Sequence, residues 1–190
     1  KPKKIILIDR DGVINYKAPR GEYISKWEDF KFIKETYDAM KYMASEGFNF
    51  IVITNQAGVS RAMINDHELE KIHLNMAKEF KKEGIEILDI YVCKHHWDKG
   101  CFCRKPNPGM LFQASKDYSF RLDQALFIGD DVRDCQTAYN AGCKSIFIGK
   151  SNDLKKISKK EQPIYSATSM IESIDAIIDF YKPLPDLEIL

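Results

Sequence analysis

The sequence predicts an α/β protein in which a mainly parallel β-sheet is covered by helices. Short apolar runs rich in β-branched residues alternate along the chain with longer segments whose apolar residues recur at helical spacing. The apolar runs are continuous, which is typical of parallel strands that are buried on both faces. We expect one domain over residues 1–190, because this length can bury a core and no repeat divides the chain.

Five strands are expected, at Lys4–Asp9, Phe48–Thr54, Ile85–Val92, Ala125–Ile128 and Lys144–Ile148. Helices are expected at residues 34–46, at 66–83 with Asp66 as cap, after Asn107-Pro108, near Arg133–Ala141, and after a Ser169/Glu172 capping box. Residues 149–166 are polar and lysine-rich, so we expect a loop that can include a short helix. Ligands of such sheets bind at the carboxyl ends of the strands.

The composition argues against several classes of partner. Hydrophobic residues make up 44% of the chain, charged residues 30%, and the formal net charge is +1. There is therefore no bulk attraction to nucleic acid or to anionic membranes. No apolar stretch approaches the roughly 20 residues that cross a bilayer. We expect a cytoplasmic protein without nucleic-acid or membrane partners; the oligomeric state stays open, with a monomer as the hypothesis.

An acidic turn follows the first expected strand. Asp9 and Asp11 are two residues apart, and Gly12 allows the chain to turn sharply. Two carboxylates this close repel each other, and a divalent cation such as Mg²⁺, which prefers oxygen ligands, relieves the repulsion. Asp9 could attack phosphorus, and Asp11 could exchange a proton with the leaving group and with water. A solvated strand-end turn is the simpler alternative.

Polar residues also follow the later strands. Thr54, Asn55 and Gln56 offer groups that can bind phosphate oxygens, although ordinary capping explains them equally well. Arg104 and Lys105 offer cations suited to a phosphoryl group, against the alternative of an exposed basic pair.

A second acidic group follows the fourth strand. Asp130 could complete a Mg²⁺ site with Asp9 and Asp11, and Asp131 could order the waters of the ion. Asp134 could cap the following helix or brace Lys105. Each signal is weak alone, but their order at successive strand ends is specific.

This order resembles the haloacid dehalogenase (HAD) superfamily of phosphotransferases, whose four motifs match Asp9/Asp11, Thr54, Lys105 and Asp130 over residues 4–150. The resemblance implies a Rossmann-like three-layer α/β/α sandwich with sheet order 5-4-1-2-3 and no large cap domain. It also implies that Asp9 is the nucleophile, Asp11 the general acid/base, and that Thr54 and Lys105 stabilise the phosphoryl group. Mg²⁺ would lie on Asp9, the Asp11 backbone carbonyl and Asp130.

A zinc-binding loop is expected at residues 93–103. Cys93, His95, Cys101 and Cys103 offer three thiolates and one imidazole within eleven residues, and structural zinc takes four such ligands in a tetrahedron. His96 is an alternative ligand, and a cluster of reduced thiols is the alternative to a metal. The closed shell would be structural and would hold the loop that presents Arg104 and Lys105.

The zinc loop with Arg104–Leu111 and Thr54–Val59 narrows the resemblance to the D-glycero-D-manno-heptose 1,7-bisphosphate phosphatases. The substrate implied is a small phosphorylated sugar, with Asn55, Gln56, Arg61 and Arg104 as candidate contacts. The histidinol-phosphate phosphatases share this loop, and the five-residue gap before Cys101 is typical of them.

Two departures bear on the substrate. Val13 stands where Thr is common, and Asp131 stands where the heptose group usually has Lys. A different class of function is a binding module that zinc stabilises and that has no catalytic activity. A polynucleotide 3′-phosphatase is a further alternative, but the sequence has no stripe of basic residues that would bind a nucleic acid.

Overall fold

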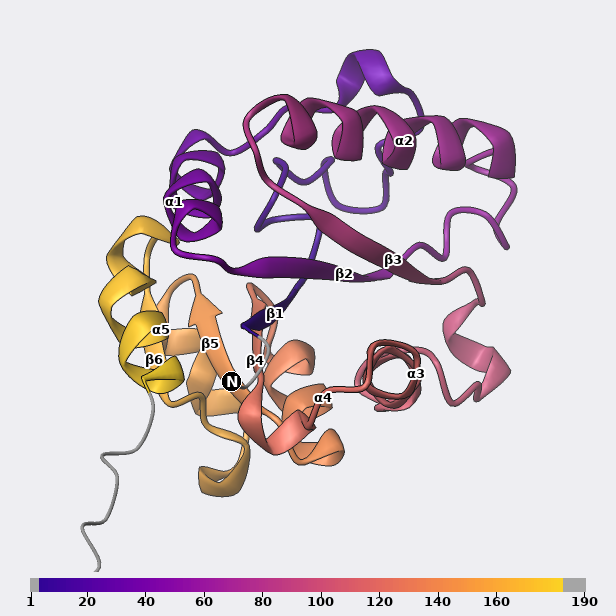
Figure 1. Cartoon of the computed structure of the whole chain (residues 1–190). Coiled ribbons are helices and arrows are strands. Elements are labelled where there is room, and N and C mark those ends of the chain that lie inside the picture. Colours follow the sequence, from indigo (N-terminus) through magenta and orange to yellow (C-terminus); the bar gives the residue numbers. More distant parts are fainter. Residues whose placement is uncertain (1–3, 183–190) are drawn as a thin grey trace, which may run out of the picture.

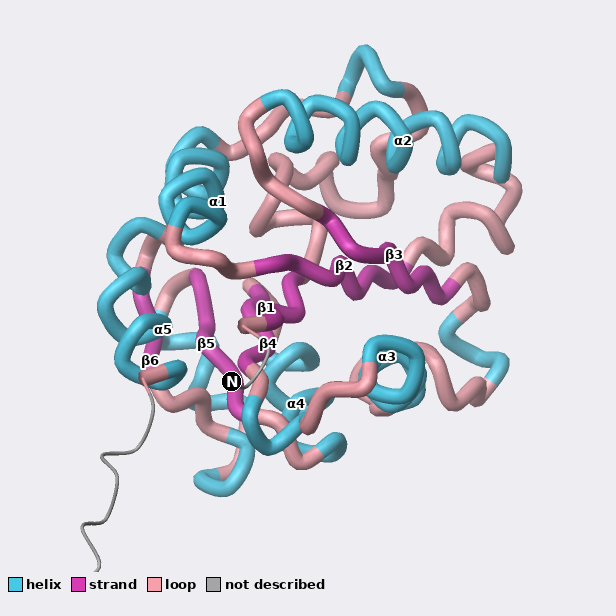
Figure 2. The backbone as a smooth tube through the Cα atoms, in the orientation of Figure 1, coloured by secondary structure: helices cyan, strands magenta, loops and turns pink. Residues whose placement is uncertain are grey.

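A six-stranded parallel sheet forms the centre of the computed structural model, which describes residues 4–182 (Figures 1 and 2). Its order is β3-β2-β1-β4-β5-β6 and every neighbouring pair is parallel. The strands are β1 (Ile5–Ile8), β2 (Asn49–Asn55), β3 (Ile87–Cys93), β4 (Leu126–Gly129), β5 (Lys144–Ile148) and β6 (Tyr165–Ala167). The expected order of five strands is confirmed, with β6 added at the edge.

Within the described residues, five α-helices cover the two faces of this sheet: α1 (Lys34–Ser45), α2 (Asp66–Lys82), α3 (Gly109–Tyr118), α4 (Val132–Ala141) and α5 (Ile174–Tyr181). Alternate residues of β1 point to opposite faces. Ile6 and Ile8 belong to the core under α1, α2 and α5, whereas Ile5 and Leu7 belong to the core over α3 and α4. Figure 1 shows α1 and α2 above the sheet and α3 and α4 below it. The expected three-layer sandwich is confirmed.

Strand β6 lies in the segment expected to be a loop. It pairs with β5 from Tyr165 to Ala167, and only Ala167 is buried. So short a strand with one buried side chain carries no apolar run, which is why the sequence does not indicate it. The same segment contains the short 3₁₀ helices Ser151–Lys156 and Lys159–Glu161; others are Trp27–Asp29, Trp97–Lys99, Leu122–Gln124 and Ile171–Ser173.

Two helix caps differ from expectation by one residue. Asn65, not Asp66, accepts a hydrogen bond from the first turn of α2. Near the last helix, the Glu172 carboxylate accepts hydrogen bonds from the backbone N–H and the hydroxyl of Thr168 as well as from the backbone of Ser169. The side-chain part of the expected capping box therefore comes from Thr168, one residue earlier than expected.

Tyr181 joins α5 to the middle of the sheet. Its hydroxyl accepts a hydrogen bond from Leu126 N (3.0 Å) in β4 and donates one to Ile5 O in β1. The end of the described chain is thereby fixed to two central strands.

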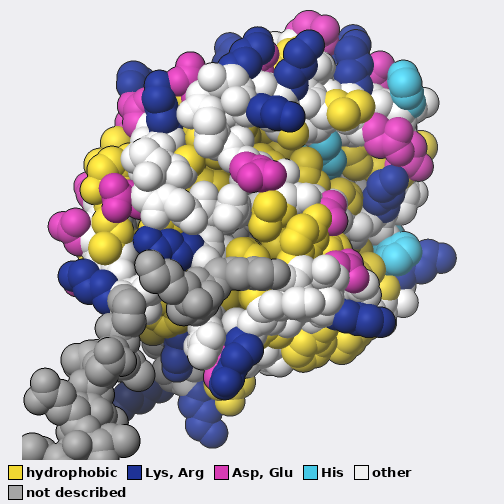
Figure 3. Space-filling view, viewed as in Figure 1, with side chains coloured by type: hydrophobic (Ala, Val, Ile, Leu, Met, Phe, Trp, Pro, Cys, Tyr) yellow, Lys and Arg dark blue, Asp and Glu magenta, His cyan; other side chains and the backbone are white. Residues whose placement is uncertain are grey.

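No helix within residues 4–182 is long and apolar enough to span a bilayer. On the face seen in Figure 3, basic and acidic side chains are interspersed.

Candidate active site

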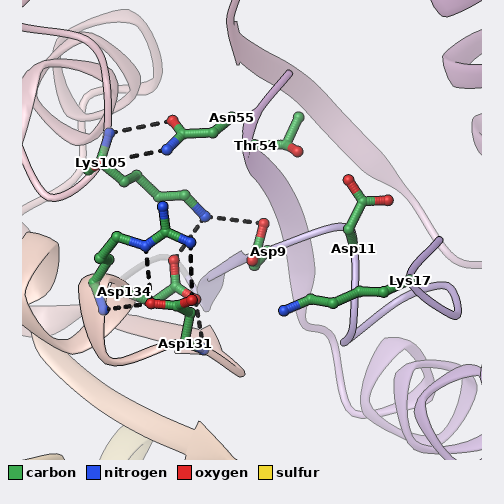
Figure 4. A pocket seen from close by; sticks show the side chains of 9 residues that line it. Asp9, Asp11, Lys17, Thr54, Asn55, Lys105, Asp131 and Asp134 are labelled. Carbon is green, nitrogen blue, oxygen red and sulfur yellow. Dashed lines mark hydrogen bonds and ion pairs between the residues drawn. The ribbon is translucent and has the colours of Figure 1, made fainter. Parts of the chain in front are cut away.

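The carboxyl ends of the central strands bring the expected acidic and basic residues together. Asp9 follows β1, Thr54 is the last residue but one of β2 and Asp130 follows β4, while Lys105 enters from the segment between β3 and α3. Asp9, Thr54 and Lys105 line a pocket of about 100 Å³ (Figure 4). Asp130 does not line it, but one of its carboxylate oxygens lies within 4.8 Å of an Asp9 oxygen. The lining residues are Asp9, Asp11, Lys17, Thr54, Asn55, Lys105, Asp131, Arg133 and Asp134.

Lys105 is buried between two carboxylates. Its Nζ lies 2.9 Å from Asp9 Oδ1 and 2.6 Å from Asp134 Oδ1, and it donates to Ile53 O at 3.3 Å. Burial alone lowers the pKa of an ammonium group, but the attraction of Asp134 and Asp9 outweighs it and raises the pKa of Lys105. The pocket therefore contains a fixed positive charge beside Asp9.

Asp9 is almost enclosed, with 7% of the residue exposed. Burial raises the pKa of its carboxyl, against the attraction of Lys105, and repulsion from Asp134 adds to the rise. A second cation at Asp9 would offset this burial and favour the ionised, nucleophilic form.

Asp11 is held by neutral and cationic donors. Its Oδ1 accepts from Arg10 Nη2 (2.8 Å) and Asn15 Nδ2 (2.9 Å), and its Oδ2 accepts from Gln56 Nε2 (2.7 Å). Burial would raise the pKa of Asp11, but Arg10 and these hydrogen bonds lower it. The carboxylate is fixed at the rim of the pocket in its ionised form.

Arg10 and His73 form a buried pair behind Asp11, which the sequence analysis does not anticipate. Arg10 is fully buried, and its Nη1 lies 2.9 Å from His73 Nε2. Burial, together with the Arg10 charge, lowers the pKa of His73 to about 3. His73 is therefore neutral and accepts the hydrogen bond through Nε2. The sequence does indicate that His73 is buried, because it follows Leu69 by four residues on the apolar face of α2.

The two amides after Thr54 are engaged in the framework of the site. Gln56 is buried, does not line the pocket, and donates to Asp11 and to Thr54 Oγ1 (2.9 Å). Asn55 lines the pocket, and its side chain bonds both the backbone N–H and the carbonyl of Lys105 (3.1 and 3.3 Å). Gln56 thus holds the acid and hydroxyl in place, instead of facing the pocket as expected of a substrate contact.

Asp130 has one paired and one unpaired oxygen. Oδ2 lies 2.6 Å from Lys17 Nζ, whereas the buried Oδ1 has no hydrogen-bond partner among the described residues. Burial and repulsion from Asp9 raise its pKa to about 6. Lys17 could not be predicted as a pocket residue, because nothing in the sequence of the irregular loop after β1 indicates where its side chain points.

Asp134 both caps the following helix and contacts Lys105, the two roles that the sequence leaves open. Asp131, expected from the sequence to order waters of the metal ion, pairs with Arg133 instead. Asp131 and Asp134 form the capping box of α4, and Asp134 also binds Lys105. Both Asp131 oxygens lie 2.9 Å from nitrogens of the Arg133 guanidinium. A Cβ on Gly129 would come within 2.2–2.4 Å of the Asp134 side chain. Only glycine at position 129 therefore leaves room for the Asp134 side chain where it is.

The carboxylates fit a divalent cation. Ligand oxygens of Asp9, Asp130 and Asp134 lie within 4.8 Å of one another. Lys105 and Asp131 N engage both oxygens of Asp134, whereas Lys105 lies against Oδ1 of Asp9, so Asp9 and Asp130 are the pair open to an ion. The unpaired Oδ1 of Asp130 is a free ligand atom. Mg²⁺ in enzymes is typically bound by one or two protein carboxylates, with water and substrate oxygens as the remaining ligands.

The cysteine–histidine loop forms a compact cluster. The Sγ atoms of Cys93, Cys101 and Cys103 lie 3.3–3.6 Å apart, and His95 Nδ1 lies 3.2 Å from Cys103 Sγ. A tetrahedral zinc ion with ~2.3 Å Zn–S bonds separates its sulfurs by about 3.8 Å, so the four groups fit it after a small expansion. His96 instead pairs with Asp98 (2.6 Å).

The two arginines proposed as substrate contacts lie outside the pocket around Asp9. Arg104 Nη1 donates to His95 O at 3.4 Å, next to the thiol cluster. Arg61 is exposed; it donates to Tyr23 Oη at 3.3 Å and lies 5.3 Å from the Trp97 ring. Neither is among the described residues that line this pocket.

Comparison with known proteins agrees with this geometry. A family model described as polynucleotide kinase 3 phosphatase matches residues 4–183, nearly the whole chain. The chain belongs to this family of HAD-type phosphatases. A phosphatase of Photorhabdus laumondii, named D-glycero-alpha-D-manno-heptose-1,7-bisphosphate 7-phosphatase, is 34% identical over 78% of this chain and 83% of its own. A Helicobacter pylori relative, named for the beta anomer, is 35% identical over 80% of this chain and 87% of its own.

A solved structure of lower sequence identity shows the same fold. The D,D-heptose 1.7-bisphosphate phosphatase of B. bronchiseptica, described as complexed with magnesium and phosphate, superposes with a TM-score of 0.84. The superposition covers 93% of this chain and 98% of that one, at 24% identity. The family membership and the HAD-type fold that the sequence predicts are both confirmed.

Proposed function

We propose that this phosphatase is a Mg²⁺-dependent enzyme that removes the 7-phosphate of D-glycero-D-manno-heptose 1,7-bisphosphate. The observation that carries the chemistry is the position of Asp9 beside both a cation and a second carboxylate: Lys105 Nζ lies 2.9 Å from Asp9 Oδ1, and ligand oxygens of Asp9 and Asp130 lie within 4.8 Å of each other. The names of the relatives from P. laumondii and H. pylori support the substrate.

In the first step, an Asp9 carboxylate oxygen attacks phosphorus and the bond to the sugar oxygen breaks. Lys105 and the Thr54 hydroxyl bind the phosphoryl oxygens as charge shifts onto them. The distance of 2.9 Å from Lys105 Nζ to Asp9 Oδ1 supports this assignment, because the ammonium lies where the phosphoryl group would meet the nucleophile.

Asp11 carries the protons of both steps. It protonates the departing sugar oxygen, then takes a proton from the water that attacks the aspartyl-phosphate and frees phosphate. The lowered pKa of Asp11 suits the second step. The first step requires the protonated form, which an incoming phosphate dianion favours by repulsion. Gln56 and Asn15 hold Asp11 in position.

Asp9, the Asp11 backbone carbonyl and Asp130 would hold Mg²⁺, which when bound neutralises the charge between nucleophile and phosphate. The four residues of the thiol–imidazole cluster would hold a structural Zn²⁺ that fixes the segment leading to Lys105. We further propose a cytoplasmic, monomeric enzyme of one domain, in which Arg61 and Arg104 reach parts of the substrate beyond the reacting phosphate.

Histidinol phosphate is the second candidate substrate. It is favoured by the five-residue gap between His95 and Cys101, which resembles the histidinol-phosphate group. A polynucleotide substrate, which the family description suggests, fits less well with a net charge of +1.

Phosphate release from both heptose bisphosphate anomers, histidinol phosphate and a 3′-phosphorylated oligonucleotide, with and without Mg²⁺, tests the proposal. We expect Mg²⁺-dependent turnover that is highest on one heptose anomer. Asp9→Asn should lower kcat by at least about 10³-fold, while the exposed control Asp29→Asn should leave it unchanged. Normal turnover by Asp9→Asn, or release without Mg²⁺, would refute the mechanism; preference for another substrate would refute the assignment.

A further inference from the structure

Lys17 lines the pocket and has no role in the proposed mechanism. It belongs to the loop after β1, and its ammonium lies 2.6 Å from Asp130 Oδ2. Figure 4 shows it extending into the pocket from the side of Asp11, towards Asp9. Its side chain is 47% exposed, so it can leave this position for water without disturbing the core.

Gly12 makes this contact possible. A Cβ at residue 12 would come within 2.1 Å of Asp130 Oδ2 and 2.5 Å of Lys17 Cε, and the backbone there has a φ of +89°. The ammonium and the carboxylate therefore meet directly above a glycine that cannot be replaced by a larger residue without moving one of them.

The charges around Lys17 are those of the candidate metal site. Asp130, Asp9 and Asp131 all attract its ammonium, and Asp130 does so most strongly. Lys105 is already engaged by Asp9 and Asp134. Lys17 is thus the cation that pairs with Asp130, at the carboxylate with a free Oδ1.

We propose that Lys17 is an internal counter-ion that competes with the divalent cation for Asp130. Its ammonium holds this carboxylate while the metal is absent and swings out when the ion binds. Whichever Asp130 oxygen the ion takes, an ammonium left 2.6 Å from Oδ2 would repel it and weaken its binding. The inference rests on the proposed function, since it uses the same metal site.

Lys17 then tunes affinity for the ion in two directions. It orients the Asp130 carboxylate before the metal arrives, and it weakens metal binding because the ion pair must be broken. Removal of the ammonium with retention of its aliphatic stem should therefore tighten Mg²⁺ binding, whereas general damage to the site would weaken it.

Calorimetric titration of magnesium-free protein that keeps its zinc, with MgCl₂ as titrant, tests the competition. We expect Lys17→Met to bind Mg²⁺ roughly three- to tenfold more tightly than wild type. Lys17→Arg, which keeps the charge, should stay near wild type, and Lys34→Met, at an exposed ion pair of α1, should be unchanged. Equal or weaker binding by Lys17→Met would overturn the inference.

A measurement on the unaltered protein covers the case in which Lys17→Met does not fold. The ¹³Cε resonance of Lys17, assigned by its absence from Lys17→Arg, should move towards that of a free lysine as MgCl₂ is added. An unchanged resonance at saturating Mg²⁺ would also overturn the inference. Wild type that hydrolyses phosphate esters with Mg²⁺ but fails these tests refutes the competition alone. Wild type that neither binds Mg²⁺ nor releases phosphate refutes the proposed function.

Discussion

Lys105 and Asp134 form a buried ion pair, with 2.6 Å between Nζ and Oδ1 and 5% and 2% of the two side chains exposed. The other Asp134 oxygen accepts a hydrogen bond from Asp131 N (3.2 Å) at the start of α4. One carboxylate therefore fixes both the cation of the pocket and the first turn of the helix behind it.

Asp134→Asn should destabilise the protein by about 3 kcal/mol, because a buried ammonium loses one of its two counter-charges. Urea unfolding of the metal-free protein measures the loss. Asp123→Asn, which breaks the exposed pair with Arg121, is the control and should leave the midpoint unchanged. An equal loss of unfolding free energy in both variants would show that the buried pair contributes no more to stability than the exposed pair.

Binding of Mg²⁺ should release protons at low pH. Asp130, with a pKa of about 6, and Asp9, whose pKa is also raised, are partly protonated near pH 6 in the metal-free site and must ionise to hold the ion. We expect about one proton released per ion at pH 6 and almost none at pH 8.5. Calorimetry in buffers of different ionisation enthalpy counts the protons; equal release at both pH values would contradict the raised pKa values.

His73 should make the protein less stable in acid. Its folded pKa of about 3 lies below the value of 6.5 for an unfolded histidine, so the unfolded state binds the extra proton between these values. Stability from this group is present above pH 6.5 and is lost as pH falls towards 3, by at most about 1.4 kcal/mol per pH unit. His73→Gln keeps an acceptor for Arg10 without this titration, so unfolding measured from pH 7 to 4 should depend less on pH in the variant. The same slope in both proteins would exclude a neutral, buried His73.

Freshly purified protein should contain about one zinc ion per chain by elemental analysis. Cys103→Ser should lose the metal and lower Tm, because structural zinc contributes to folding. Cys135→Ala, at a buried cysteine remote from the cluster, should keep the zinc. Protein without zinc before any chelator is added would remove the claim.

The sequence predicts the acidic and basic residues of the pocket well because each follows a strand that is easy to recognise. Asp9 and Asp130 come directly after continuous apolar runs, and parallel strands place their carboxyl ends at one edge. The thiol cluster is equally predictable, since the spacing of Cys93, His95, Cys101 and Cys103 is itself the signal.

The contacts within the site are less predictable from sequence. Lys17 lies in an irregular loop where no periodicity indicates direction, and the inward position of Gln56 depends on the turn that follows β2. Asp134 has two plausible roles on the basis of spacing alone, and only the position of Lys105 in space shows that it fills both.

The hydrogen bonds of Tyr181 have a consequence for the order of events during synthesis. Its hydroxyl reaches Ile5 O, 176 residues earlier in the chain, and Leu126 N in the neighbouring strand. A nascent chain can therefore pair β1 with β2 early but cannot complete this closure until residue 181 has emerged from the ribosome. Chains that terminate before residue 181 would lack the Tyr181 hydrogen bonds to β1 and β4. We expect proteases to degrade these truncated chains first.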